Sequence, residues 1–374
     1  MKHRLPSIFS LLFILLCTFS VTHLCNTAVA QTINTYQRIP NAYISGRVTE
    51  VRHSQTLGRL PERLQAVVRE PVWHLGRNSA GNYVDFQTES DTIYVRYKVS
   101  GAHSMPHMPA IGVSGVDLYY RHEPEGDWSW AFGSYSFKDT IQYRFTNVGK
   151  ANTGIYRLYL PLYNTLEWIE IAGNGTHKMN FISQGEAKPI VVYGTSITQG
   201  ACASRPGLAW TNIVGRALPN PIVNLGFSGN GRLEEPILEL MKQEEAAVFI
   251  LDCIPNLSIR AELSSTQLAE RITLAVKSIR QKHPHVPIVL AAHSSAHTPG
   301  FMNVHTQREY AESSSVAEAT YHKLTQEEGL KNLHWVSERD FDLDIESTVD
   351  YAHPNDIGMM KIAHAYLALL NKLL

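Results

Sequence analysis

Residues 190–200 read Ile-Val-Val-Tyr-Gly-Thr-Ser-Ile-Thr-Gln-Gly, a short apolar run that ends at a glycine and a serine. Consecutive apolar residues are typical of a strand buried on both faces, as in a parallel sheet. Gly194 permits a tight turn, and Ser196 then follows the carboxyl end of the strand, where α/β sheets bind their ligands. Ser196 is therefore a candidate nucleophile, although a serine at this place could also simply cap a helix.

The same alternation continues to the end of the chain. Short apolar runs lie at residues 190–193, 222–225, 247–251, 288–292 and 333–336. Segments with helical period lie between and after them, at residues 209–218, 236–242, 266–281, 309–328 and 355–370. Five strands with helical crossovers predict an α/β domain with a parallel sheet covered on both faces, which we assign to residues 186–374.

The chain before this domain has a period of two. In residues 93–99, apolar Ile93, Val95, Tyr97 and Val99 alternate with other side chains, which is typical of a half-buried strand. Further strands are expected at residues 116–122, 128–132, 142–146, 155–161 and 166–171. This spacing predicts an N-terminal, jelly-roll-like β-sandwich over residues 31–185. Its aromatic residues are expected mainly in the core, although exposed ones could stack on sugar rings.

The first thirty residues read as a signal peptide. Lys2 and Arg4 precede an apolar run at residues 8–19, and Ala28-Val29-Ala30 offers a cleavage site before Gln31. The run is too short to span a bilayer of about 30 Å, so no integral membrane segment is expected after cleavage. We therefore expect a periplasmic or secreted protein.

The charge balance argues against one class of partner, and the cysteines raise the possibility of a disulfide. The 33 Lys and Arg nearly balance the 34 Asp and Glu, which argues against a nucleic-acid surface. Signal cleavage would leave Cys202 and Cys253, in a compartment where disulfides persist. Both follow predicted strand ends, so they could be bridged, and two separate buried thiols are the alternative.

The segment Asp350-Tyr351-Ala352-His353-Pro354 supplies a candidate partner for the serine. A three-residue spacing on a loop lets the carboxylate hold one imidazole nitrogen of His353 while the other nitrogen faces a hydroxyl. An ordinary surface histidine is the alternative. The 17 histidines include no His-Glu-x-x-His spacing, and no Cys-x-x-Cys occurs, so we expect neither a metal nor a cofactor.

Together these motifs resemble the SGNH (GDSL-like) hydrolases, whose serine follows the first strand and whose Asp-x-x-His lies near the C-terminus. Asn-Leu-Gly-Phe-Ser-Gly-Asn-Gly at residues 224–231 resembles the second block of the family. Asp-Cys-Ile-Pro-Asn at residues 252–256 stands where the third block places its asparagine, without the common Gly-x-Asn-Asp form. Gly-Val-Asp-Leu-Tyr at residues 115–119 matches the Gly-x-Asp-Leu-Tyr signature of a sandwich fused to one branch of the family.

The resemblance implies a flavodoxin-like hydrolase domain and a set of roles. Ser196, His353 and Asp350 would form a catalytic triad. The oxyanion hole would comprise the backbone N–H groups of Ser196 and Gly229 and the side-chain amide of Asn256. Gly226 is the less favoured backbone donor, and Asn230 is the alternative side chain.

Two further residues are candidates for substrate contact. Arg205 follows the nucleophile within Cys-Ala-Ser-Arg-Pro-Gly at residues 202–207, a loop that is also familiar in this branch, and could orient a polar substrate. His293 follows a predicted strand end and could line the pocket. A structural or solvated role is the alternative for each.

The function implied is an exported serine esterase that removes short acyl groups, especially acetyl, from carbohydrates through an acyl-enzyme. A lipase or lysophospholipase is one alternative, and the lack of a long apolar segment resembling a lid weakly disfavours it. A non-catalytic glycan-binding protein that uses the aromatic sandwich is the other. The presence of a complete Ser, Gly, Asn and Asp-x-x-His set disfavours that second alternative.

Overall fold

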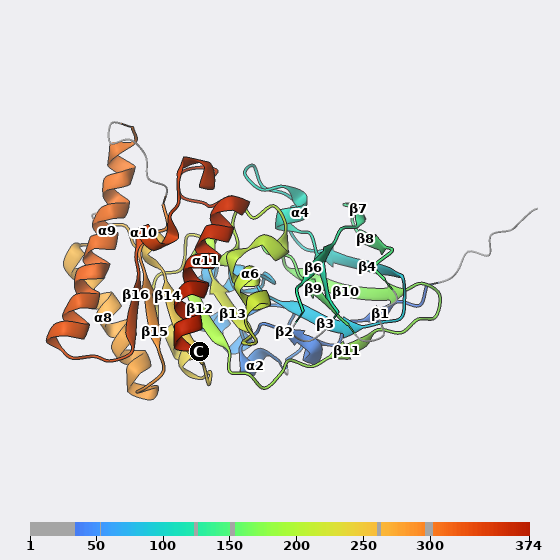
Figure 1. Ribbon diagram of the computed structural model, residues 1–374, viewed down its shortest axis with the longest axis horizontal. Coiled ribbons are helices and arrows are strands. Elements are labelled where there is room, and N and C mark those ends of the chain that lie inside the picture. Colours follow the sequence, from blue (N-terminus) through green and yellow to red (C-terminus); the bar gives the residue numbers. More distant parts are fainter. Residues whose placement is uncertain (1–33, 53, 123–125, 150–153, 260–262, 296–301) are drawn as a thin grey trace, which may run out of the picture. The chain divides into compact units, whose positions relative to one another are not determined.

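The structure, a computed structural model, describes residues 34–374 apart from 53, 123–125, 150–153, 260–262 and 296–301 (Figure 1). The predicted signal peptide lies outside the described residues. Residues Thr35–Leu374 form one unit. Within the described part of the chain, no helix combines the length and apolar character needed to cross a bilayer.

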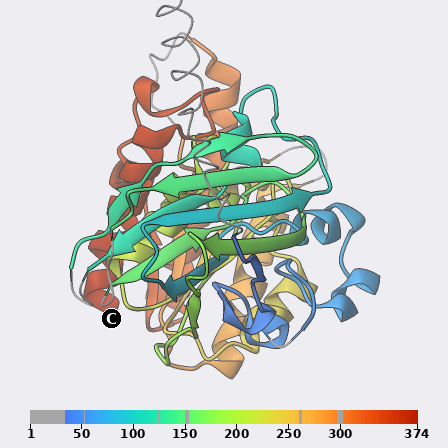
Figure 2. The same cartoon turned by 90° about the vertical axis from the view of Figure 1, so that its right-hand side faces the viewer.

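Two antiparallel sheets form a sandwich. The first contains, in order, β1 (Gln37–Arg38), β10 (Leu166–Gly173), β4 (Thr92–Val99), β8 (Ile141–Thr146) and β7 (Ser134–Ser136). The second contains β11 (Asn180–Ile182), β3 (Tyr83–Gln87), β9 (Ile155–Tyr159), β5 (Asp117–Arg121) and β6 (Ser129–Ala131), with β2 (Ile44–Ser45) paired to β3. Alternate residues of β4, such as Val95 and Tyr97, pack in one core with Phe86 and Leu158 of the second sheet. Figure 2 shows the sandwich strands facing the viewer.

A five-stranded parallel sheet follows in the chain. Its order is β13 (Ile222–Gly226), β12 (Ile190–Gly194), β14 (Val248–Asp252), β15 (Ile288–Ala291) and β16 (Leu333–Val336). Every residue of β12, β13 and β14 is buried, which explains why these strands read as continuous apolar runs. The expected α/β architecture and its five strands are confirmed.

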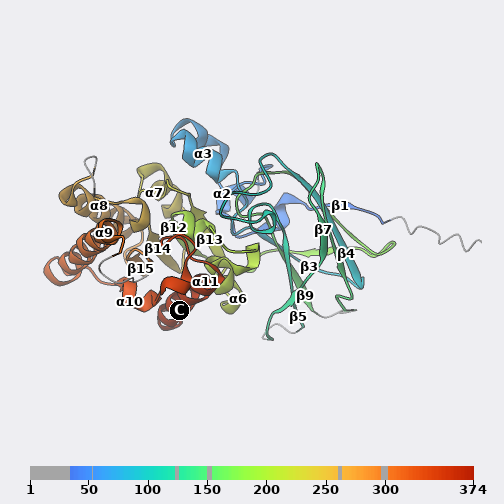
Figure 3. The same ribbon diagram turned by 90° about the horizontal axis from the view of Figure 1, so that it is seen from above.

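Helices cover both faces of the parallel sheet. One core cluster includes residues of α7 (Glu235–Lys242), α8 (Ser265–Lys282) and α9 (Val304–His322). The cluster on the other face includes residues of α6 (Trp210–Ala217) and α11 (Asp356–Leu373). Figure 3 shows α7 and α8 on one side of the sheet and α6 and α11 on the other. The chain leaves α9 through a single π-helical turn, Lys323–Glu327.

The remaining elements are short. The α-helical ones are α2 (Thr49–Arg52), α3 (Glu70–Gly76), α4 (Ala110–Val113), α5 (Ser196–Gln199) and α10 (Glu338–Phe341). The 3-10 turns are η1 (Asn41–Tyr43), η2 (Glu62–Ala66), η3 (Pro206–Leu208), η4 (Ile254–Asn256) and η6 (Ile345–Ser347).

The segment between β2 and β3 packs onto the parallel sheet. Leu64 and Trp73 belong to the same core cluster as Phe249 of β14. Arg59, which is 1% exposed, donates hydrogen bonds to the carbonyls of Asn224 at 3.1 Å and Gly226 at 2.8 Å. Burial lowers the pKa of Arg59 to about 9. The guanidinium is thus held by carbonyl oxygens and fixes the end of β13, where the next loop begins.

Candidate active site

The turn after β12 presents Ser196 as the first residue of α5. The side chain of Thr195 accepts a hydrogen bond from the N–H of Ile197 at 3.3 Å, which starts the helix, and Gly200 ends it with a φ of 107°. A left-handed residue is tolerated there because glycine lacks a Cβ. Since Ser196 begins the helix, its own N–H has no acceptor within α5. Ser196 is 6% exposed, so the nucleophile candidate is largely enclosed.

Ser196, His353 and Asp350 meet in one hydrogen-bonded chain. Ser196 Oγ lies 2.8 Å from His353 Nε2, and His353 Nδ1 lies 2.7 Å from Asp350 Oδ2. Ser196 and His353 are 157 positions apart in the sequence, and the fold brings them into contact. The arrangement has the geometry in which an imidazole can take a proton from a hydroxyl while a carboxylate fixes its tautomer.

The loop around Asp350 is built to hold His353. Asp350 Oδ1 accepts from the N–H of His353 at 2.8 Å and of Ala352 at 3.2 Å. Burial alone would raise the pKa of Asp350, but hydrogen bonds from the backbone and ring of His353 outweigh it and hold that pKa below its usual value. The carboxylate therefore stays ionised. The intervening Tyr351 has a φ of 77°, a strained value for a residue other than glycine.

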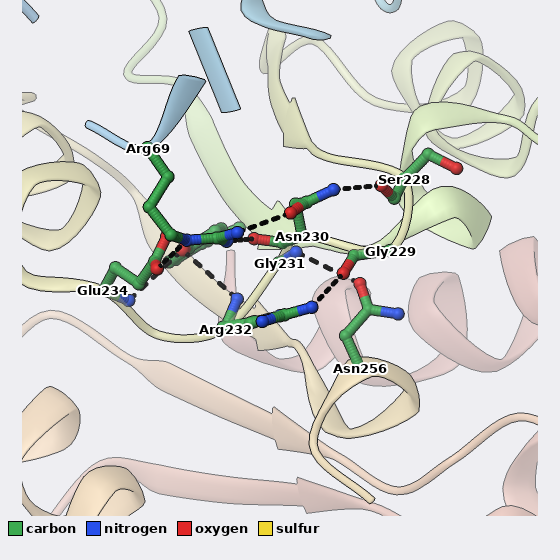
Figure 4. Close-up of polar contacts among 9 residues, drawn as sticks. Arg69, Ser228, Gly229, Asn230, Gly231, Arg232, Glu234 and Asn256 are labelled. Carbon is green, nitrogen blue, oxygen red and sulfur yellow. Dashed lines mark hydrogen bonds and ion pairs between the residues drawn. The ribbon is translucent and has the colours of Figure 1, made fainter. Parts of the chain in front are cut away.

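Gly229 and Asn256, which carry two of the predicted oxyanion donors, line a common cavity of about 370 Å³. Asn256 Oδ1 accepts from the N–H of Gly231 at 3.1 Å. This bond orients the amide, so its NH₂ group lies on the side away from Gly231 (Figure 4). Gly229 has a φ of 68°, and a Cβ there would meet no atom within 4 Å. No residue of the described chain accepts a hydrogen bond from the Gly229 N–H.

Arg69 supports the loop that carries Gly229, a role that the sequence did not reveal. Its Nη1 donates to Asn230 Oδ1 at 2.7 Å, and its Nε and Nη2 lie 2.5 and 3.2 Å from the carboxylate of Glu234 (Figure 4). The Asn230 amide in turn donates to the carbonyl of Ser228 at 2.7 Å. Both ends of the Asn230 amide thus have a partner, which disfavours Asn230 as the alternative donor. No local pattern connects an arginine and a glutamate 165 positions apart.

Arg205 has structural partners, which favours the structural role over the alternative that it orients the substrate. Its Nη1 lies 2.5 Å from Asp117 Oδ2 and donates to the Tyr119 hydroxyl at 2.7 Å. Asp117 also accepts from the N–H of Gly207 at 2.9 Å and from the Trp130 indole at 2.7 Å. Asp117 and Tyr119 belong to the Gly-x-Asp-Leu-Tyr motif. The motif therefore binds the loop after the nucleophile to the sandwich.

His293 does not lie on a surface that a substrate could reach. It is 1% exposed, and its ring stacks on Tyr310 with centroids 3.8 Å apart. Burial lowers the pKa of His293 to about 3, with a further contribution from His353, so it is neutral at physiological pH. The expectation of substrate contact is therefore not supported. The ring of His107, in the chain between β4 and α4, lies 6.1 Å from that of His353.

The two cysteines of the described chain are free, so the possible disulfide between them does not form. Cys253 packs in the core cluster on one face of the parallel sheet, and its thiol donates to the carbonyl of Tyr193 at 3.4 Å. Cys202 packs in the cluster on the other face. Both cysteines follow strands that end at the same edge of the sheet, but their side chains lie on opposite faces of it.

Among the described residues, no group of three His, Cys, Asp or Glu side chains could hold a metal ion.

Known proteins share this organisation. Residues 187–371 match the model of the GDSL-like Lipase/Acylhydrolase family, and residues 32–179 match the GxDLY model, the N-terminus of Esterase_SGNH_hydro-type. A GDSL-like lipase from Bacteroides ovatus is 28% identical, with a TM-score of 0.79 over 91% of this chain and 98% of that one. No curated protein matches the sequence.

Two more distant structures share the fold. The salicylyl-acyltransferase SsfX3 from a tetracycline biosynthetic pathway is 17% identical, with a TM-score of 0.70 over 90% of this chain and 98% of that one. The acetyl xylan esterase Est2A from the rumen bacterium Butyrivibrio proteoclasticus is 11% identical, with a TM-score of 0.51 over 91% and 99%. With both halves of the chain matched, and with the serine, histidine and aspartate motifs in contact, the chain belongs to the GDSL-like lipase/acylhydrolase family, in the form that carries a GxDLY N-terminal domain.

Proposed function

We propose that this protein is an exported serine esterase that hydrolyses short-chain acyl esters, chiefly O-acetyl esters, on carbohydrates. The observation that carries the proposal is the hydrogen-bonded series Ser196, His353 and Asp350. Gly229 and Asn256 follow β13 and β14, the two strands on either side of the strand that precedes Ser196. Export rests on the signal peptide predicted for residues 1–30.

The first half of the reaction is acyl transfer to Ser196. Its Oγ attacks the ester carbonyl while His353 Nε2, at 2.8 Å, takes the hydroxyl proton. The bond between the carbonyl carbon and the sugar oxygen then breaks, and His353 returns the proton to that oxygen. The products are a free sugar hydroxyl and an acyl-enzyme. In the second half, water loses a proton to His353 and attacks the acyl group, releasing the carboxylic acid and regenerating Ser196.

The carbonyl oxygen gains negative charge in both halves. The N–H groups of Ser196 and Gly229 and the side-chain amide of Asn256 would donate to it. Preorganised donors act mainly when the charge develops, and one of them typically contributes about 3 kcal/mol to transition-state stabilisation. Asp350, ionised and bonded to His353 Nδ1, stabilises the imidazolium that forms between the two proton transfers.

The cavity beside the donors favours a polar substrate over an alkyl chain. Four of its eight described lining residues have polar side chains, namely Arg232, Asn256, Ser258 and Arg271, and three have apolar ones, namely Pro255, Leu257 and Leu263. A lipase or lysophospholipase needs an apolar surface for a long acyl chain, because most of its binding energy comes from burying methylene groups. The lining therefore supports carbohydrate esters in preference to lipids.

A second function, glycan binding by the sandwich, is favoured by one observation. Trp130, Phe132 and Tyr135 lie on or between β6 and β7 and are 48%, 76% and 54% exposed. Large exposed aromatic side chains are well suited to stack on sugar rings. This surface would complement the esterase by holding a glycan. The assembled triad argues against an inert α/β domain.

The test is to assay purified protein with acetylated oligosaccharides, with long-chain lipid esters and with 4-nitrophenyl acetate, and to measure the released acid. We expect acetate release from the oligosaccharides and the small ester, and little from lipids. Turnover of the lipids alone would favour the lipase alternative. Binding of oligosaccharides without turnover of any ester would favour the non-catalytic one.

A further inference from the structure

Among the described residues that line the cavity beside Gly229 and Asn256, two are arginines and none carries a carboxylate. Arg232 lies in the loop after β13, and Arg271 lies on α8. The other lining residues are Gly229, Pro255, Asn256, Leu257, Ser258 and Leu263, none of which is acidic. The positive charge is local, because the whole chain has a formal net charge of -1.

Neither arginine has an anionic partner among the described residues. Arg232 Nη2 donates to the carbonyl of Gly229 at 3.1 Å, a neutral acceptor, which holds the guanidinium next to the oxyanion donors (Figure 4). Arg271 has neither a hydrogen bond nor an ion pair with any described residue, and its side chain is partly buried. Two other arginines near the site are paired with carboxylates, Arg69 with Glu234 and Arg205 with Asp117.

We propose that Arg232 and Arg271 bind an anionic group of the ester substrate, so that the preferred substrates are acylated acidic glycans. This inference rests on the proposed esterase function. The proposed acyl group is short and carries no charge, so the anion belongs to the sugar, as the carboxylate of a uronic acid or as a sulfate. Both groups present several oxygens to a guanidinium fork, the geometry for which arginine is suited.

The location makes the two arginines determinants of specificity. A glycan whose ester carbonyl reaches the oxyanion donors would extend into the same cavity and meet Arg232 first. Removing one donor from a hydrogen bond to a charged group typically weakens binding about tenfold or more. A neutral sugar would lack this contribution, and dissolved salt would screen it where the site is open to solvent.

The experiment compares kcat/KM for acetylated oligogalacturonides, an acetylated sulfated oligosaccharide and neutral acetylated xylo-oligosaccharides of equal length. We expect the wild-type enzyme to prefer at least one acidic substrate, and added NaCl to reduce the ratio of acidic to neutral kcat/KM. Arg232→Gln and Arg271→Gln should each lower that ratio about tenfold, mainly through KM. Arg38→Gln is the control, because Arg38 is an exposed arginine on β1 with a 72% exposed side chain, and it should leave the ratio unchanged. The carboxylate and sulfate substrates separate the two sources of charge.

A binding measurement separates this inference from the esterase function. Calorimetry with the Ser196→Ala variant and a de-acetylated oligogalacturonide or sulfated oligosaccharide should show binding that weakens when Arg232→Gln is added. Such binding without turnover of any ester by the wild-type enzyme would overturn the esterase function and leave the anion site standing. Ester turnover with no preference for acidic substrates, or with a preference that survives both arginine substitutions, would overturn the anion site.

Discussion

Ser196 and His353 depend on one another for reactivity. A serine hydroxyl is a weak nucleophile until a base takes its proton, and His353 Nε2 is the base within 2.8 Å. We expect Ser196→Ala and His353→Ala each to lower kcat by roughly 10³ to 10⁶-fold, with the double variant little worse than either single one. Steady-state kinetics with 4-nitrophenyl acetate would show this, and losses that multiply in the double variant would contradict a shared mechanism.

The oxygen and the NH₂ group of the Asn256 side chain have separate roles. Its Oδ1 holds the N–H of Gly231 at 3.1 Å, and its NH₂ is the proposed oxyanion donor. We expect Asn256→Ala to lower kcat about 10² to 10³-fold with nearly unchanged KM and melting temperature. Asn256→Asp is the matched variant, because it keeps an oxygen for Gly231 but loses the donor. Normal kcat in folded Asn256→Ala would assign the third donor elsewhere.

For individual residues, the motifs predicted the contacts within the triad but not the roles of Arg205 and His293. The motif spacings anticipated the contacts among Ser196, His353 and Asp350, because a strand end and a C-terminal loop recur at one edge of an α/β sheet. Arg205 and His293 were not predictable in the same way. Their roles depend on Asp117 and Tyr310, residues whose proximity only the tertiary structure reveals.

Among the elements, the loop between β13 and α7 depends on Arg69, the residue that precedes α3. Losing Arg69 would leave Asn230 Oδ1 and Glu234 without their guanidinium partner and allow Gly229 to shift. We expect Arg69→Met to lower kcat by about 10 to 100-fold with a smaller effect on KM, because small misplacements of catalytic groups cost mainly in rate. Arg69→Lys should recover part of the loss. Steady-state kinetics on a small acetate ester would measure both variants.

Arg63 provides the control for that substitution. It forms an ion pair with Glu50 at 2.7 Å, but both side chains are about half exposed and the pair does not touch the loop of Gly229. Arg63→Met should leave kcat unchanged. Equal losses in Arg69→Met and Arg63→Met would indicate general destabilisation instead of a positioning role.

The end of β14 carries a buried acid that should make stability depend on pH. Asp252 is 2% exposed, and burial raises its pKa to about 6, although Thr198 donates to Oδ2 at 3.2 Å. In the unfolded chain its pKa is about 4, so between about pH 4 and 6 only the folded state holds the proton. Folded stability should therefore fall as pH rises through this window, by about 3 kcal/mol.

The variant Asp252→Asn should lose this contribution to the pH dependence. We expect its free energy of unfolding, measured by urea denaturation, to change less between pH 4.5 and 7.5 than that of the wild-type protein. The difference should be largest at pH 7.5, where the wild-type carboxylate is ionised and buried. The same pH dependence in both proteins would show that Asp252 does not bind the proton.

The prediction of helices and strands succeeded for continuous apolar runs and for a long helix with a regular apolar period. The five apolar runs of the parallel sheet and the helix over Ser265–Lys282 appear within one or two residues of their expected bounds. The two-residue strands β1 and β2 were not predicted, because so few residues show no period. The start of α9 lies at Val304, five residues before the expected one, since its polar first turn gives no apolar signal.

Across the whole molecule, polar contacts join the sandwich strands to the α/β half. Arg157 of β9 pairs with Asp85 at 2.8 Å and donates to the carbonyl of Gly215 in α6 at 3.1 Å. The Tyr159 hydroxyl donates to the carbonyl of Asn212 at 3.2 Å. The sandwich thus contacts the helix that follows the nucleophile loop, and through these contacts it can influence the site without touching substrate.

The most consequential of these contacts is the pair of Asp117 and Arg205. Asp117 is 3% exposed, and burial raises its pKa even with the Arg205 guanidinium beside it, which shows how strongly the site excludes water. Removing one member of a buried pair leaves the other charge without compensation and typically costs about 3 to 5 kcal/mol. The Arg205 side chain is 20% exposed, so a value at the lower end of that range is expected.

We therefore expect Arg205→Met to lower the free energy of unfolding by about 3 kcal/mol while KM for a small acetate ester stays nearly constant. Asp117→Asn should destabilise comparably, and the double variant should be less destabilised than the sum of the two, because neither charge is then left alone. Urea denaturation of the four proteins gives the coupling, and kinetics gives KM. A large increase in KM at unchanged stability would instead assign Arg205 to the substrate, because an arginine that only joins the loop after the nucleophile to the sandwich should affect the free energy of unfolding and not KM.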